Sequence, residues 1–309
     1  MPIRVDRILA AAAMAVAGAA LAAPSLTAAA AVGAAAPVAI VAAEKFYGDV
    51  AQQIGGPEVS VTSILGNPDE DPHLFEASPS VARDIADARI VIYNGLGYDP
   101  WIEKLLRATA DDGAGHSRTA IAVSALVGAA SGGNPHIWYD PATMLALANG
   151  LAAELNKADP SHRAEYGTRL GRFRDSLRPI IARIAALRRR FAGTPVTATE
   201  PVFGYMFAAL GMRVRNQQFQ LAVMNNTEPS AADVAAFEDD LRAHRVRLLV
   251  YNRQATDPAA RRMLAIAKAA DVPVVGASET EPPGTSYQRW IAGALDSLDR
   301  AMAEQQQRP

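Results

Sequence analysis

The sequence predicts an α/β protein made of two lobes, each with a parallel sheet, joined by one long linking helix. Short apolar runs that suit strands alternate with helical segments along most of the chain, as in parallel α/β layers. One amphipathic segment of about 30 residues interrupts this alternation near the middle. Segments 78–94 and 228–252 also repeat one pattern, in which a Pro-Ser pair is followed by a helix and then by a strand ending in Tyr-Asn.

The first alternating region holds four expected strands and four expected helices. Phe46, Val50 and Ile54 recur at helical spacing and are followed by two glycines, which predicts a helix that ends there. Ser78 precedes a proline and is expected to begin another helix. The expected strands are 38–42, 59–64, 89–94 and 120–123, and the expected helices are 45–54, 81–88, 101–108 and 141–158.

The long segment and a second alternating region follow. Apolar residues recur every three or four positions from Tyr166 to Phe191, which predicts one helix. Asp159, Pro160 and Ser161 are suited to its beginning. After it, the expected strands are 196–199, 247–252 and 272–276, and the expected helices are 202–210, 231–244, 258–270 and 287–303.

These elements predict four parts of the chain. They are a signal peptide with an Ala-rich leader over 1–36, an N-terminal lobe over 37–158, the linking helix over 159–191 and a C-terminal lobe over 192–309. Open α/β sheets bind ligands beyond the carboxyl ends of their strands. We therefore expect both lobes to present those loops to a shared cleft.

The N-terminus resembles a secretory signal peptide. Arg4 and Arg7 precede an apolar run from Ile8 to Ala23, which is shorter than the ~20 residues of a membrane-spanning helix. The chain also contains no cysteine, which a lipoprotein needs for its lipid. We therefore expect a soluble, monomeric protein that is secreted to the periplasm and is not a lipoprotein.

Composition excludes several classes of function. The 309 residues carry a net charge of −2, and 20% of them are charged, so no large basic surface is available for nucleic acid. The lack of cysteine excludes disulfides, thiolate zinc sites and thiol nucleophiles.

Two histidines occur in a similar local pattern. His73 follows Pro72, and His136 follows Pro135, each at the start of a short apolar and aromatic run. Proline restricts its own backbone and that of the preceding residue, so each imidazole is held on a stiff loop. A local hydrogen-bonding role would explain one such histidine. The recurrence favours a metal site shared between two loops.

Several motifs in order resemble the zinc- and manganese-specific solute-binding proteins of bacterial ABC importers, the bacterial solute-binding protein 9 family. They are Asp71-Pro72-His73, Tyr93-Asn94-Gly95, Asn134-Pro135-His136-Ile137-Trp138, Phe203-Gly204-Tyr205 and Glu228-Pro229-Ser230. The resemblance extends from about Val38 to Ala303. It implies one metal ion in the cleft between two lobes and delivery of that ion to a permease.

The resemblance also implies a set of ligands. His73 and His136 match the first two ligands of the family, and Glu200 stands where many zinc receptors have histidine and manganese receptors have glutamate. The fourth ligand falls on Glu279, with Glu281 as an alternative. The chain departs from many relatives at Asn252, where they have glutamate.

The chemistry of these side chains indicates a class of ion. Two imidazoles and two carboxylates would neutralise a divalent ion, and Zn²⁺, Mn²⁺ and Fe²⁺ accept mixed nitrogen and oxygen ligands. Ca²⁺ and Mg²⁺ prefer oxygen alone. Chelating carboxylates favour Mn²⁺, whereas Zn²⁺ binds the same atoms more tightly by the Irving–Williams order. The choice between Zn²⁺ and Mn²⁺ stays open at this point.

We therefore expect a receptor, not an enzyme, that captures Zn²⁺ or Mn²⁺ outside the cytoplasm and delivers it to an ABC permease. A zinc-dependent hydrolase is the main alternative, because it too uses histidine and carboxylate ligands. Against it, the sequence has no His-Glu-x-x-His and no Gly-x-Ser-x-Gly motif. A metal-binding adhesin or buffer would share the site and differ only in its partner.

Overall fold

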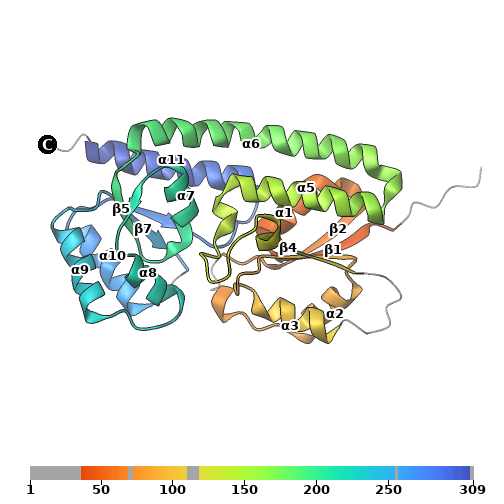
Figure 1. Cartoon of the computed structure of the whole chain (residues 1–309), viewed down its shortest axis with the longest axis horizontal. Coiled ribbons are helices and arrows are strands. Elements are labelled where there is room, and N and C mark those ends of the chain that lie inside the picture. Colours follow the sequence, from red (N-terminus) through yellow and green to blue (C-terminus); the bar gives the residue numbers. More distant parts are fainter. Residues whose placement is uncertain (1–35, 69–71, 110–117, 255–256, 307–309) are drawn as a thin grey trace, which may run out of the picture. The chain divides into compact units, whose positions relative to one another are not determined.

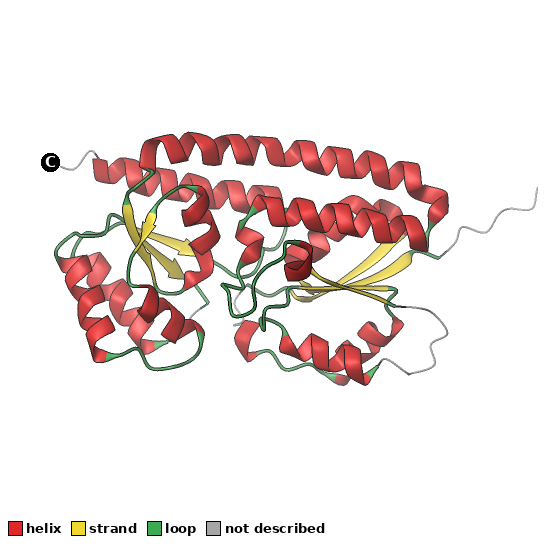
Figure 2. Ribbon diagram, viewed as in Figure 1, coloured by secondary structure: helices red, strands yellow, loops and turns green. Residues whose placement is uncertain are grey.

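A computed structural model describes residues 36–68, 72–109, 118–254 and 257–306, and these residues form one compact unit. The expected signal peptide and leader, apart from residue 36, lie outside the described residues, as does Asp71. Figures 1 and 2 show two sheets with helices packed against them. Among the described residues, no helix is both long enough and apolar enough to cross a membrane.

The first sheet has four parallel strands in the order β2-β1-β3-β4. Their bounds are Val38–Glu44 for β1, Val59–Leu65 for β2, Ile90–Tyr93 for β3 and Thr119–Ala122 for β4. The central strands β1 and β3 are almost wholly buried, as expected for parallel strands covered by helices on both faces. The carboxyl ends of all four strands lie at one edge of the sheet.

The second sheet repeats this arrangement, with the order β6-β5-β7-β8 and parallel pairing throughout. Its strands are Pro195–Ala198 (β5), Arg213–Val214 (β6), Leu249–Asn252 (β7) and Val274–Ala277 (β8). In chain order both sheets therefore follow the pattern 2-1-3-4. The predicted fold class, two parallel-sheet lobes and a long helix, is confirmed.

Helices of the first lobe lie on both faces of its sheet (Figure 1). They are Lys45–Gly55 (α1), Pro79–Asp87 (α2), Pro100–Ala108 (α3), Val123–Leu126 (α4) and Pro141–Ala158 (α5). The Oγ of Ser78 accepts a hydrogen bond from the backbone N–H of Val81, so this serine caps α2 as its position before proline predicted.

The long helix α6 runs from Arg163 to Phe191 and passes along both lobes (Figure 1). A 3₁₀ turn over Pro160–His162 precedes it, so the regular helix begins three residues after the predicted proline. The C-terminal helix α11, Tyr287–Gln306, packs against α6. Ion pairs from Arg183 and Arg190 to Asp299 join the two helices.

The second lobe contains α7 (Gly204–Ala209), α8 (Gln217–Met224), α9 (Ala231–Arg242) and α10 (Pro258–Ala269). No sequence pattern predicted β6, α8 or the short helix α4, whose first residue, Val123, was expected to end a strand. Strand β6 has only two residues, which is too short for an alternating pattern to be visible. Asn216, which precedes α8, has a left-handed backbone, and an asparagine at such a position is equally typical of a turn.

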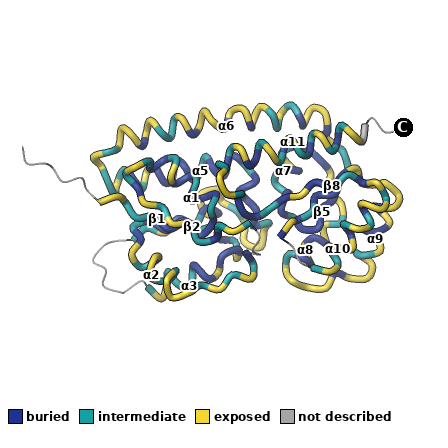
Figure 3. Tube along the Cα trace, turned by 180° about the vertical axis from the view of Figure 1, so that it is seen from behind, coloured by how far each residue is buried: buried dark blue, intermediate teal, exposed yellow. Residues whose placement is uncertain are grey.

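One large hydrophobic core extends through both lobes and beneath α6. It includes Phe46, Trp138, Phe203 and Trp290, and Figure 3 shows buried residues on the strands and on the inner side of the helices. The ring of Phe46 stacks on Trp138, with centroids 4.8 Å apart, and on Trp290, with centroids 5.7 Å apart. Because α11 supplies Trp290, aromatic packing holds the C-terminal helix against the first lobe.

Candidate metal centre

Polar residues gather where the parallel strands end. His73 lies in the loop after β2, Glu200 lies just after β5 and Glu279 just after β8, while Asn252 is the last residue of β7. This is the edge at which open α/β sheets bind ligands. His136 comes from the loop between α4 and the 3₁₀ turn Ile137–Tyr139.

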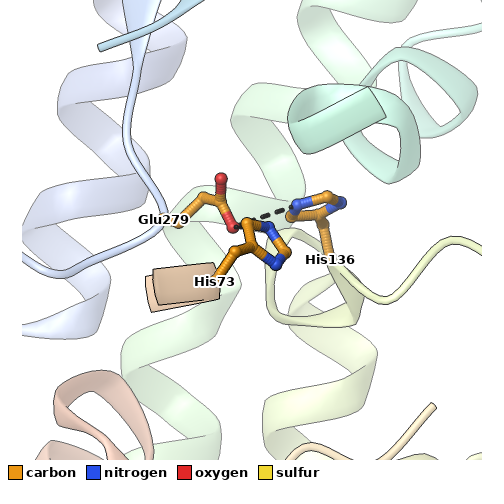
Figure 4. Close-up of side chains that lie close together, drawn as sticks. All are labelled: His73, His136 and Glu279. Atoms are coloured by element: carbon orange, nitrogen blue, oxygen red, sulfur yellow. Dashed lines mark hydrogen bonds and ion pairs between the residues drawn. The ribbon is translucent and has the colours of Figure 1, made fainter. Parts of the chain in front are cut away.

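The structure brings His73, His136 and Glu279 together. One donor atom from each lies within 4.8 Å of the other two, and Figure 4 shows the three side chains pointing toward one another. The Oε2 of Glu279 is 3.2 Å from Nε2 of His136 and 3.4 Å from Nε2 of His73. Both imidazoles therefore direct the same ring nitrogen at one carboxylate oxygen. A transition metal could be held by all three groups.

The loop of His136 is fixed by two asparagines. The Oδ1 of Asn134 lies 3.0 Å from the backbone nitrogen of His136 and 2.6 Å from its Nδ1. Because this oxygen can only accept, Nδ1 carries a proton, and Nε2 is the ring nitrogen directed at Glu279. The buried side chain of Asn94 donates to the carbonyl of Pro135, 3.0 Å away, and so holds the loop from beneath.

His73 occupies the more open side of the cluster. It lies in the 3₁₀ turn Pro72–Leu74, and 21% of its side chain is exposed, whereas the side chains of His136 and Glu279 are fully buried. Its ring meets the edge of Tyr98, with centroids 5.3 Å apart. The hydroxyl of Tyr98 in turn donates to Oε2 of Glu279, at 3.0 Å.

The environment of Glu279 favours its ionised form despite complete burial. Burial alone would raise its pKa, but the positive charge and hydrogen bond of His136, followed by those of His73, outweigh that effect. The pKa of Glu279 is therefore held below its usual range. Its backbone N–H donates to Oε1 of Gln254, which fixes the loop after β8.

The other two predicted carboxylates lie in different surroundings. Glu200 is buried, with 5% exposed, but it is not part of the three-residue cluster; its Oε2 accepts a hydrogen bond of 2.9 Å from Asn252, which also binds Glu279. Glu281 lies 3.9 Å from Lys45 Nζ. Burial, and then repulsion from Asp49, raises the pKa of Glu281 to about 8.

Sequence reasoning gave no role to three residues at this site. Tyr98 binds Glu279, Asn134 orients His136, and Asn252 joins two carboxylates. Only Asn134 had a visible signal, its place in the Asn-Pro-His motif. The contacts of Tyr98 and Asn252 join residues far apart in the chain, and a lone tyrosine or asparagine gives no spacing pattern.

Several other hydrogen bonds cross between the lobes. Tyr139 donates to the carbonyl of Ser278 at 2.7 Å, and Lys45 donates to the carbonyl of Pro282 at 2.8 Å. Tyr205 of the second lobe donates to the carbonyl of Asn134 at 2.9 Å. The cluster is thus enclosed by direct contacts between lobes.

The two parallel-sheet lobes, the long helix and the cluster of imidazoles and carboxylate define a metal-binding solute-binding protein of the kind that serves ABC importers. Residues 40–301 match the family model described as zinc-uptake complex component A, ZnuA, and the chain belongs to this family.

Individual relatives agree with this class. The chain is 27% identical to a putative metal-binding protein of Treponema pallidum over 277 residues, and this alignment covers 83% of this chain and 84% of that protein. It is 28% identical over 141 residues to the manganese-binding lipoprotein MntA of Bacillus subtilis, spanning 45% and 46% of the two chains. The structure resembles the periplasmic zinc-binding protein TroA of Treponema pallidum with a TM-score of 0.69, at 19% identity, covering 85% of this chain and 98% of that one.

The relatives correct one prediction. We expected a periplasmic protein that is not a lipoprotein, but a relative such as MntA is named as a lipoprotein. What the relatives support is an extracytoplasmic location.

Proposed function

We propose that this protein is an extracytoplasmic receptor that captures one divalent transition metal ion between its lobes and delivers it to an ABC permease. The observation that carries this proposal is the convergence of His73, His136 and Glu279, from three separate segments, within 4.8 Å of one another. The ion is the cargo of the protein and takes part in no reaction there.

We assign four ligands. They are Nε2 of His73, Nε2 of His136, and one oxygen each of Glu279 and Glu200. Glu279 is supported over Glu281 because it lies beside both imidazoles, whereas Glu281 lies beside Lys45. Glu200 is supported by its link to Glu279 through the amide of Asn252. Two neutral imidazoles and two carboxylates would balance the charge of a divalent ion.

The ligand chemistry favours Zn²⁺ or Mn²⁺ as the cargo, with Fe²⁺ as a further candidate. Nitrogen ligands disfavour Ca²⁺ and Mg²⁺, which prefer oxygen. Relatives carry names that refer to zinc, manganese and iron, such as the iron-binding protein YfeA of Yersinia pestis, 25% identical over 180 residues (53% of this chain, 54% of that one).

We infer that the protein is not an enzyme and acts as a monomer. A catalytic zinc site keeps one position for water or substrate, whereas four protein ligands fill a tetrahedral site. The competing hydrolase would turn over an ester, peptide or phosphate in a reaction that is lost in His73→Asn. An adhesin or a metal buffer would have the same site as the receptor and would differ only in its partner. If metal uptake requires this chain, the receptor is favoured over both.

A titration of the metal-free protein tests the ligand assignment. Zn²⁺ and Mn²⁺ are added separately to the wild type, His73→Asn and His136→Asn. His244→Asn is the matched control, because His244 is exposed and asparagine tolerates its left-handed backbone. We expect the wild type to bind one ion per chain. Both test variants should lose more affinity than the ~10–100-fold that follows loss of a residue which only hydrogen-bonds to a ligand. Equal affinity in the wild type and His136→Asn would refute the site.

Uptake measurements test delivery. Cells that lack the gene should take up less of the bound ion under metal limitation. Wild-type protein should restore uptake, and His136→Asn should not. Normal uptake without the gene would favour the adhesin or buffer.

A further inference from the structure

Asn252 joins the two carboxylates of the proposed site. It is the last residue of β7, with 2% exposed, and its side-chain nitrogen lies 2.9 Å from Oε2 of Glu200 and 2.7 Å from Oε1 of Glu279. Both N–H groups of one amide are therefore used by two acidic residues that come from different strands. A neutral side chain separates two negative charges that would otherwise face each other in a buried place.

The orientation of this amide is fixed by its own oxygen. The Oδ1 of Asn252 accepts from the backbone N–H of Gln254 at 3.1 Å, so the –NH₂ group must face the carboxylates. Its backbone N–H donates to Thr199 Oγ1, 3.1 Å away, beside Glu200. The side-chain amide is thus held by the backbone N–H of Gln254 and by the two carboxylates, and it cannot turn over without losing these bonds.

The two oxygens of Glu279 consequently differ. Oε1 is held by Asn252, and Oε2 faces His136, His73 and Tyr98. Glu200 likewise has one oxygen, Oε2, held by the same amide. The amide of Asn252 thus engages one oxygen of each carboxylate and makes that oxygen a weaker ligand. Oε2 of Glu279, which also accepts from the Tyr98 hydroxyl, is the oxygen directed at both imidazoles.

We propose that Asn252 is a positioning residue that limits Glu200 and Glu279 to one ligand oxygen each and thereby favours Zn²⁺ over Mn²⁺. Zn²⁺ suits four ligands in a tetrahedron, whereas Mn²⁺ suits more numerous oxygen ligands, which chelating carboxylates would supply. This inference rests on the proposed function, because it assumes that both carboxylates bind the ion. It assigns to Asn252 a preference between ions that the four ligands alone leave open.

The test compares the wild type with Asn252→Ala. Gln220→Ala is the matched control, because Gln220 is also a buried amide of the second lobe, with 2% exposed, and donates to the carbonyl of Arg215 away from the site. Zn²⁺ and Mn²⁺ affinities are measured by competition with a chelator. The visible absorption of bound Co²⁺ reports coordination number, since four-coordinate Co²⁺ absorbs much more strongly than six-coordinate Co²⁺.

We expect Asn252→Ala to lower Zn²⁺ affinity about 10–100-fold, the usual effect of losing an outer partner. Mn²⁺ affinity should fall less, so the ratio of Zn²⁺ to Mn²⁺ affinity should decrease by more than about twofold and at most by the loss of Zn²⁺ affinity. The Co²⁺ absorption should weaken. Gln220→Ala should match the wild type in all three measurements.

A second variant covers the case in which Asn252→Ala does not fold. Asn252→Asp keeps the size of the side chain and replaces both donors with acceptors. Zn²⁺ affinity below that of the wild type supports positioning by the N–H donors. Affinity equal to or above the wild type would overturn it, because residue 252 would then act by size alone or as a ligand.

Different results would refute the proposed receptor function and the proposed role of Asn252. If the wild type binds neither ion, or if His136→Asn binds as well as the wild type, the proposed function fails and this inference fails with it. If binding depends on the histidines but Asn252→Ala keeps the wild-type ratio of Zn²⁺ to Mn²⁺ affinity within about twofold, the role of Asn252 alone is overturned.

Discussion

The Nδ1 of His136 lies 2.6 Å from the Oδ1 of Asn134, two residues earlier in the chain. This contact fixes which ring nitrogen carries the proton and leaves Nε2 directed at Glu279. A residue that binds no ion therefore decides whether a proposed ligand can bind one.

Loss of Asn134 should weaken metal binding without removing a ligand. We expect Asn134→Ala to lower Zn²⁺ affinity about 10–100-fold, because the ring and the loop of His136 would no longer be held. Isothermal titration measures this change. Asn149→Ala is the control, since Asn149 is exposed and donates to the carbonyl of Leu145 within α5. Unchanged affinity in Asn134→Ala would show that the contact does not orient the ligand.

Metal affinity should fall as the pH is lowered from 8 to 5. Protons and the ion compete for Nε2 of His73 and His136, so metal affinity should fall as protons occupy these nitrogens. The pKa of Glu279 lies below its usual range, so this carboxylate stays ionised throughout and contributes no decrease. Competition titrations at each pH measure the effect. The control His244→Asn should show the same dependence of metal affinity on pH as the wild type. A flat profile contradicts a site with two histidines.

A buried acid pair beneath the site should make the metal-free protein less stable as pH rises. Burial, and then the charge of Asp99, raises the pKa of Glu44 well above its usual value. Burial also raises the pKa of Asp99 to about 6, although hydrogen bonds from the N–H groups of Gly95 and Asn94 oppose this. The folded state then binds these protons more tightly than the unfolded state. The free energy of unfolding therefore decreases from about pH 4 through pH 6 for Asp99, and further above that for Glu44.

Glu44→Gln should remove part of this decrease. Glutamine has nearly the same shape but does not ionise, so we expect a flatter stability profile and a more stable protein at pH 8. Urea unfolding at pH 5, 6.5 and 8 in the presence of a chelator measures it. The exposed Glu165→Gln should stay within about 0.5 kcal/mol of the wild type at each pH. A profile for Glu44→Gln as steep as that of the wild type would exclude Glu44 as its source.

Trp138 should contribute both to stability and to the site. It is fully buried, stacks on Phe46 and meets the edge of His136 with ring centroids 5.1 Å apart. We expect Trp138→Ala to lower the free energy of unfolding by about 3–5 kcal/mol, because it leaves a large cavity. Ile181→Ala on the exposed side of α6 should change it by less than about 0.5 kcal/mol. Thermal unfolding of the metal-free variants compares them, and a small effect for Trp138→Ala would mean that the core closes around the gap.

Local patterns were sufficient to predict most of the fold. The regular apolar spacing from Tyr166 to Phe191 predicted α6, and apolar runs predicted the strands of both sheets apart from β6. Strand β6 was missed because two residues, Arg213 and Val214, join the sheet only through the neighbouring β5. Such an element is determined by tertiary pairing and leaves no pattern in the sequence.

The site was predictable where a motif restricts the backbone, and not where distant contacts decide. His73 and His136 each follow a proline, so their loops could be recognised from two residues. Glu279 and Glu281 lie two residues apart, and the family resemblance favoured Glu279 while keeping Glu281 as an alternative. Their surroundings differ because Lys45, far away in the chain, lies beside Glu281 while the imidazoles lie beside Glu279. No local pattern could have indicated that difference.

The lobes divide the proposed ligands by element. Both imidazoles come from the N-terminal lobe, and both carboxylates, with the amide that joins them, come from the C-terminal lobe. A cation bound by ligands from both lobes would cross-link them. Separating the lobes would then require breaking coordinate bonds as well as hydrogen bonds. Neither half expressed alone would hold more than two of the four donors, and cargo would therefore raise the resistance of the whole chain to unfolding.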